Sequence, residues 1–85
     1  MDKKRKAALK GAAQQLEATV HVGKEGVTEK VVGEVVKQLK SKRLVKERLL
    51  PSMEQDRHEA AEKLAAAASA VLIEVRGRTA VLAKE

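Results

Sequence analysis

The sequence of 85 residues contains no cysteine and no phenylalanine, tyrosine or tryptophan. Because there is no thiol, disulfide bonds, thiolate metal sites and thiol catalysis are excluded. Because there is no aromatic ring, nucleic-acid bases cannot be stacked as they are on sheet-platform RNA binders, and little material is left for an aromatic-rich ligand pocket. Any nucleic-acid contact would therefore have to use lysine, arginine and backbone N–H groups.

Long apolar runs are also missing. No stretch approaches the roughly 18 to 20 apolar residues of a membrane-spanning helix, and the basic N-terminal sequence lacks the apolar segment of a secretory signal. The length and the 44% hydrophobic content are typical of one domain, residues 1–85, with one modest core. We expect a soluble, cytoplasmic monomer that has no cofactor, no membrane contact and no small-molecule substrate.

The net charge is +6, and it is unevenly distributed. Residues 1–10 carry five basic side chains and one acidic, and residues 37–48 carry six basic and one acidic. Two basic clusters on a nearly balanced body indicate a surface that binds a polyanion. Solvated lysines that only maintain solubility would give the same composition, so the charge alone does not decide between these interpretations.

Residue spacing predicts three helices and four strands. The helices are expected over residues 3–17, from a cap at Thr28 to about Lys40, and from a capping box at Ser52 and Gln55 to about Ala68. The strands are expected over residues 19–22, 44–50, 71–76 and 79–83, with a type II′ turn at Gly77–Arg78 between the last two.

This order, α-β-α-β-α-β-β, predicts a single α/β domain with a mixed four-stranded sheet. A strand–helix–strand crossover requires parallel strands, whereas the final hairpin must add an antiparallel one. We expect the helices to cover one or both faces of the sheet.

Gly23 and Gly26 bracket Lys24 and Glu25 between the first strand and the second helix. Glycine permits a positive φ and allows the backbone of a ligand to approach, since no Cβ is in the way. The free N–H groups at the start of the helix, near Thr28, favour an anion, and Lys24 adds a positive charge. A purely structural turn has the same spacing, so these residues alone do not show whether the loop holds a phosphate backbone.

Several further motifs accompany this loop in a fixed order. They are "VHVGKEGVTE" at 20–29, which includes the loop, "LVK" at 44–46, "DR" at 56–57 and "GRTAVL" at 77–82. In these motifs, and over nearly the whole chain, the sequence resembles the CRM domain (chloroplast RNA splicing and ribosome maturation) in its stand-alone, YhbY-like form.

The resemblance implies an RNA-binding α/β domain, similar to the C-terminal domain of bacterial initiation factor three. Stand-alone members are associated with precursors of the large ribosomal subunit, and fused members with organellar intron splicing. By resemblance, we expect ribosomal precursor RNA as the partner and the glycine loop as a contact with its backbone. The residues expected at the RNA surface are Gly23, Lys24, Glu25, Gly26, Thr28, Lys30, Lys3, Lys6, Lys10, Arg76 and Arg78.

Three other functions fit parts of the sequence. A KH-like RNA binder also has a G-x-x-G loop, but that loop joins two helices, and residues 17–22 would then be helical. An enzyme is disfavoured: "HEAAE" at 58–62 lacks the second histidine of a zinc helix, and no nucleophile–base pair appears, so we expect no catalytic or metal-binding residues. A basic module that docks on an acidic protein is the third alternative.

Overall fold

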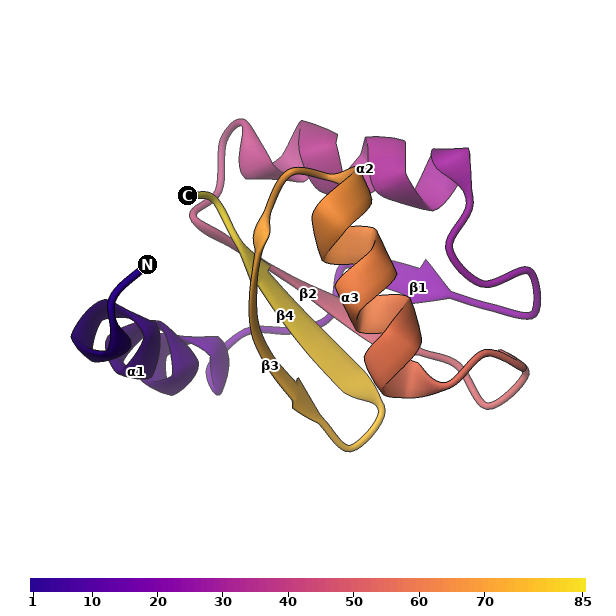
Figure 1. Ribbon diagram of the computed structural model, residues 1–85, viewed down its shortest axis with the longest axis horizontal. Coiled ribbons are helices and arrows are strands. Elements are labelled where there is room, and N and C mark those ends of the chain that lie inside the picture. The colour runs from indigo at the N-terminus through magenta and orange to yellow at the C-terminus, as the bar shows by residue number, and fades with distance from the viewer.

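The computed structural model describes residues 1–85 as three helices and four strands (Figure 1). The helices are α1 (Lys3–Ala13), α2 (Glu29–Leu39) and α3 (Arg57–Ala67). The strands are β1 (Val20–Val22), β2 (Leu44–Leu49), β3 (Val71–Arg76) and β4 (Thr79–Ala83). The expected order of elements is thus confirmed. No helix combines the length and the apolar character that crossing a bilayer would require.

The four strands form one mixed sheet in the order β1-β2-β4-β3. β1 and β2 are parallel, as the crossover through α2 requires, and β4 is antiparallel to both β2 and β3. The two-residue hairpin is also confirmed, because Arg76 pairs with Thr79 and Gly77 has a φ of 56°. A positive φ at the first central residue alone is the pattern of a type II′ turn. The last strand along the chain therefore lies inside the sheet, and β1 forms one of its edges.

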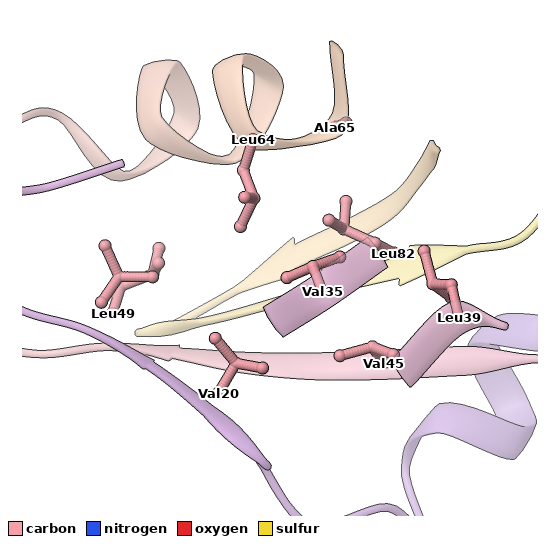
Figure 2. Packing of buried hydrophobic residues seen from close by; sticks show 9 residues of the cluster. Val20, Val35, Leu39, Val45, Leu49, Leu64, Ala65 and Leu82 are labelled. Carbon is pink, nitrogen blue, oxygen red and sulfur yellow. The ribbon is translucent and has the colours of Figure 1, made fainter. Parts of the chain in front are cut away.

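Helices cover both faces of the sheet. α2 and α3 pack on one face, where their side chains meet those of β1, β2 and β4 (Figure 2). This larger cluster consists of Val20, Val22, Val35, Leu39, Val45, Leu49, Leu64, Ala65 and Leu82. α1 covers the other face with a smaller cluster, which consists of Leu9, Ala13, Leu44, Ile73, Val81 and Ala83.

Glu47, in the middle of β2, is the one residue with an ionisable side chain that is buried in the core, with 0% of its surface exposed. Side chains alternate along a strand, so Glu47 faces the same way as Val45 and Leu49, toward α2 and α3. Neither carboxyl oxygen has a hydrogen-bond partner. Desolvation by burial raises the pKa of this carboxyl to about 9, so the side chain is neutral near pH 7.

The expected start of α3 was wrong. The helix does not begin at a capping box formed by Ser52 and Gln55, and its N-cap is Asp56. The carboxylate of Asp56 accepts hydrogen bonds from the backbone N–H of His58, at 3.0 Å, and of Glu59, at 3.1 Å. One side chain therefore satisfies two N–H groups of the first turn, which makes Asp56 the better cap.

The expected end of α1 was also too late, because the helix stops at Ala13 rather than near residue 17. The chain must leave the face covered by α1 and reach the edge of the sheet within a few residues. Thr19 already belongs to the sheet, since its N–H donates to the carbonyl oxygen of Lys46 at 3.0 Å. This extended approach leaves Leu16 only loosely packed, with 38% of its surface exposed.

Candidate nucleic-acid interface

The loop between β1 and α2 contains a closed four-residue turn. The N–H of Gly26 donates to the carbonyl oxygen of Gly23 at 2.9 Å. Gly26 has a φ of 71°, in the left-handed region that favours glycine, and it is buried. The turn therefore lifts Lys24 and Glu25 to an exposed tip, and Gly26 is required by the backbone itself.

Gly23 has a different role from Gly26, because its φ is not positive. A Cβ at Gly23 would lie 3.8 Å from Leu50 Cδ1 and 4.0 Å from Ser52 Oγ, which are ordinary contact distances. The expected left-handed conformation thus occurs at one of the two glycines. The fold would accept a side chain at Gly23. The consequence of having none there is that a ligand can approach the backbone closely.

The N-terminus of α2 opens beside this turn. Thr28 is the N-cap, as expected, and its hydroxyl accepts from the N–H of Val31 at 3.2 Å. The first N–H groups of a helix have no partner within it, which leaves those of Glu29 and Lys30 for water or a ligand. Such groups, together with the helix dipole, favour an anion.

A groove of about 490 Å³ joins the turn, the edge strand and the first two turns of α2. Six of the residues expected at the RNA surface line it, namely Gly23, Lys24, Glu25, Gly26, Thr28 and Lys30. Five further residues that the sequence analysis did not place there complete it, namely Thr19, Val20, His21, Val31 and Glu34. The structure therefore builds one continuous site from the loop and from the two consecutive elements that it connects, β1 and α2.

Hydrogen bonds order one wall of this groove. The hydroxyl of Thr19 donates to Oε1 of Gln38 at 2.5 Å, and Nε2 of Gln38 donates to Oε1 of Glu34 at 3.1 Å. This chain links the segment before β1 to the outer face of α2 and leaves the second oxygen of Glu34 able to accept another bond. A carboxylate in this position can accept from an amino group on the edge of a base.

The formal charges that line the groove are balanced. Lys24 and Lys30 are opposed by Glu25 and Glu34, and His21 is exposed on the edge strand. The groove is therefore suited to shaped contacts with backbone N–H groups and hydrogen-bonding side chains more than to attraction by a strong field.

The other residues expected at the RNA surface do not join this groove. Lys3, Lys6 and Lys10 belong to α1, which packs on the opposite face of the sheet from α2. Arg76 and Arg78 flank the tip of the β3–β4 hairpin, and both are exposed. Basic side chains are thus distributed over several parts of the surface.

The histidines of the chain lie apart from any metal-binding arrangement. His58 is exposed on the first turn of α3, beside Glu59 and on the same helix as Glu62. No three histidine, cysteine, aspartate or glutamate side chains come together in a group that could hold a metal ion.

Known proteins resemble this chain in sequence over most of its length. The Methanocaldococcus jannaschii protein named "Probable RNA-binding protein MJ0652" is 42% identical over 81 residues, which are 93% of this chain and 60% of that protein. The Bacillus subtilis protein named "Probable RNA-binding protein YqeI" is 32% identical over 82 residues, which are 96% of this chain and 85% of that protein. The chain thus spans less than two thirds of the length of the archaeal relative.

The fold is also found in a solved structure. The solution structure of the Staphylococcus aureus hypothetical protein SAV1595, described as "a putative RNA binding protein", superimposes with a TM-score of 0.86 at 27% sequence identity. The match covers 100% of this chain and 88% of the other. The family model of the CRS1 / YhbY (CRM) domain matches residues 1–84. The expected resemblance is confirmed, and the chain belongs to the CRS1 / YhbY (CRM) domain family.

Proposed function

We propose that this chain binds RNA and that the backbone of one RNA strand lies in the groove between β1 and α2. The observation that carries the proposal is the meeting, in one groove, of the exposed turn at Gly23–Gly26 and the free N–H groups at the start of α2. Membership of the CRM family and the RNA-binding names of two relatives support it.

The three alternatives fit the structure less well. Residues 20–22 are a strand, so the loop does not join two helices as it does in a KH domain. No metal-binding group accompanies the helix that carries "HEAAE". A module that docks on an acidic protein would not need a groove beside an open helix N-terminus. A competition experiment in solution between RNA and an acidic protein would distinguish the two functions.

The groove predicts specific roles for its residues. Phosphate would accept hydrogen bonds from the N–H groups of Glu29 and Lys30, with Lys24 adding a mobile charge from the tip of the turn. Since no aromatic side chain is available, base contacts would come from Thr19, His21 and Glu34, which adds side-chain hydrogen bonding to the lysine, arginine and backbone contacts expected from the sequence.

The test of this proposal is titration of the full chain with a structured fragment of large-subunit ribosomal RNA at several salt concentrations. Lys24→Ala should weaken binding and reduce the slope of log K against log salt by roughly 0.7 to 0.9, as expected for the loss of one phosphate contact. Lys24→Arg, which keeps the positive charge at the tip of the turn, is the control. Equal behaviour of the two folded variants would contradict the proposed site.

We further propose that the RNA belongs to a precursor of the large ribosomal subunit, as the family resemblance implies. Cell extract separated on a sucrose gradient and probed for the protein should show it in the fraction of immature large subunits. If the protein is found only in the free fraction, or only with small subunits, this assignment is contradicted. RNA binding itself is tested separately by the titration.

A further inference from the structure

A second hollow, of about 400 Å³, lies where α2 ends. Its polar lining is dominated by basic side chains from three separate segments, and no acidic side chain lines it. The lining residues are Arg5, Leu39, Lys40, Ser41, Lys42, Arg43 and Lys84. Figure 1 shows that this end of α2, near both chain termini, lies far from the loop that connects β1 to α2.

Backbone hydrogen bonds fix the segments that carry these charges. The N–H groups of Ser41 and Lys42 donate to the carbonyl oxygen of Gln38, at 3.1 and 2.8 Å, so the turn after α2 is closed. The N–H of Lys84 donates to the carbonyl oxygen of Arg43 at 3.1 Å, which joins the end of β4 to this turn.

The third segment is α1, which contributes Arg5. Its position is set at the N-terminus by the cap, where Oδ1 of Asp2 accepts from the backbone N–H of Arg5 at 2.7 Å. Further along the helix, Leu9 packs in the smaller core cluster together with Leu44. The guanidinium group is therefore brought to the hollow by packing of the whole helix.

Stabilisation of the helix dipole accounts for only part of this arrangement. A cation near the C-terminus of a helix interacts favourably with the helix dipole, which accounts for Lys40. It does not explain Arg5 or Lys84, which come from other segments. Five like charges around one hollow repel each other, and a bound polyanion would remove that repulsion.

The solvent face of α2 connects the two sites. Residues spaced by three or four positions share one side of a helix, and the series Lys30, Glu34, Lys37, Ser41 runs from the groove to the basic hollow. At about 1.5 Å per residue, the 11 residues of α2 separate the two sites by roughly 16 Å. A ligand that reaches both must therefore be longer than a single phosphate group.

We propose that the hollow of Arg5, Lys40, Lys42, Arg43 and Lys84 is a second phosphate-binding site, which anchors the same RNA that occupies the groove. This inference rests on the proposed function. The charge-balanced groove shapes the contact with one part of the strand, and the hollow supplies most of the electrostatic affinity. Two linked contacts on one molecule increase binding beyond either contact alone.

The test compares the wild-type chain with the double variant Lys42→Ala/Arg43→Ala, titrated with the same ribosomal RNA fragment. Loss of two phosphate contacts should reduce the salt slope by roughly 1.4 to 1.8 and lower the affinity about tenfold or more at low salt, a larger effect than that of Lys24→Ala. The swapped variant Lys42→Arg/Arg43→Lys retains both charges and should bind as the wild type does. Thermal unfolding of each variant verifies that it is folded.

A second measurement detects the site without RNA. In a titration of the wild-type chain with inorganic pyrophosphate, followed by amide chemical shifts, residues 40–43 and Lys84 should shift at lower concentration than the turn at Gly23–Gly26. Shifts confined to the glycine turn would overturn the second site.

The outcomes separate this inference from the proposed function. RNA binding by the wild-type chain, with an unaltered slope in the folded double variant, would overturn the second site and leave RNA binding intact. A parallel titration with polyglutamate tests for an acidic protein partner. If the double variant loses binding to polyglutamate but not to RNA, the second RNA site is overturned in favour of such a partner. Absence of RNA binding by the wild-type chain would overturn the proposed function, and the second site with it.

Discussion

The ammonium nitrogen of Lys46, in β2, donates to the carbonyl oxygen of Leu16 at 3.3 Å and lies 3.5 Å from that of Ala13. Ala13 is the last residue of α1, and its carbonyl also accepts from the N–H of Leu16 at 3.1 Å, whereas Leu16 lies beyond the end of the helix. Lys46 thereby connects the end of α1 to the middle of the sheet. One basic residue of the cluster at 37–48 is thus used by the fold, whereas Lys40, Lys42 and Arg43 are exposed.

Lys46→Met should therefore lower stability and leave RNA affinity nearly unchanged. The loss of a partly buried, charged hydrogen-bond donor predicts a decrease of about 1 kcal/mol in the free energy of unfolding. Urea unfolding measures this change, and Lys42→Met is the matched control, with little expected effect on stability. A Lys46→Met protein of unaltered stability that binds RNA more weakly would contradict the structural role.

The buried carboxyl of Glu47 predicts a stability that decreases as the pH rises. Its pKa is about 9 in the folded chain and 4.5 is its ordinary value, so the folded state holds one more proton than the unfolded state between these values. The contribution of Glu47 to the free energy of unfolding is therefore most favourable below about pH 4.5, and it decreases progressively as the pH rises to about 9. Near pH 7 the loss amounts to about 3 kcal/mol.

The difference between the wild type and Glu47→Gln isolates this contribution, because the amide does not titrate. In urea unfolding at several pH values, the free energy of unfolding of Glu47→Gln should increase relative to that of the wild type as the pH rises from 5 to 8. Glu47→Leu should be more stable than the wild type at pH 8, since it removes two buried oxygens without partners. A constant difference across this range would show that the carboxyl is not buried in its neutral form.

The two glycines of the turn should respond differently to alanine. Gly26→Ala would place a side chain at a φ of 71°, with its Cβ 3.1 Å from Oε1 of Gln55, and should cost on the order of 1 kcal/mol or more. Gly23→Ala should change stability by less than about 0.5 kcal/mol. If the RNA backbone approaches Gly23, the same substitution should still weaken RNA binding. Similar losses of stability at the two positions would contradict this assignment.

The cap of α3 can be tested in the same manner. Asp56→Ala should lower the free energy of unfolding by about 1 kcal/mol, because two backbone N–H groups lose their partner. Ser52→Ala, at the position where the sequence pattern suggested a cap, should have little effect. The reverse order of effects in thermal unfolding would show that the helix begins earlier in solution.

The hairpin tip gives a prediction about RNA alone. Arg76 and Arg78 are exposed, and the sheet bond at this point is made by backbone atoms, since the N–H of Leu49 donates to the carbonyl oxygen of Arg78 at 2.7 Å. Replacing both arginines with alanine should weaken RNA binding with almost no change in melting temperature. A large fall in melting temperature with unaltered binding would contradict a place at the RNA surface.

Local signals were sufficient for the order of elements and for most of the sheet. Thr28 predicted the start of α2, and Gly77 predicted the hairpin, because each signal depends on neighbouring residues. The insertion of β4 between β2 and β3 was not predicted. It depends on which strands pair across the sheet, and no short motif encodes that choice.

The site was predictable only where it is local. The turn and Thr28 are contiguous in sequence and were found, whereas Thr19 and Glu34 meet across the groove only after α2 has folded back beside β1. The burial of Glu47 was missed because a charged residue in a strand normally indicates the solvent face. Arg5 and Lys84 could not be assigned to one hollow, since their proximity is created by the packing of α1 and by the central position of β4.

The position of β4 has a consequence for synthesis of the chain. β2 and β3 have no direct contact as neighbours in the sheet and are joined only through β4. During translation, residues 1–76 would therefore emerge with β2 lacking a hydrogen-bonding partner along one edge and β3 lacking any partner strand, and such edges invite incorrect pairing. We expect the sheet to close only after residues 79–83 have left the ribosome, so that the domain folds in one late step.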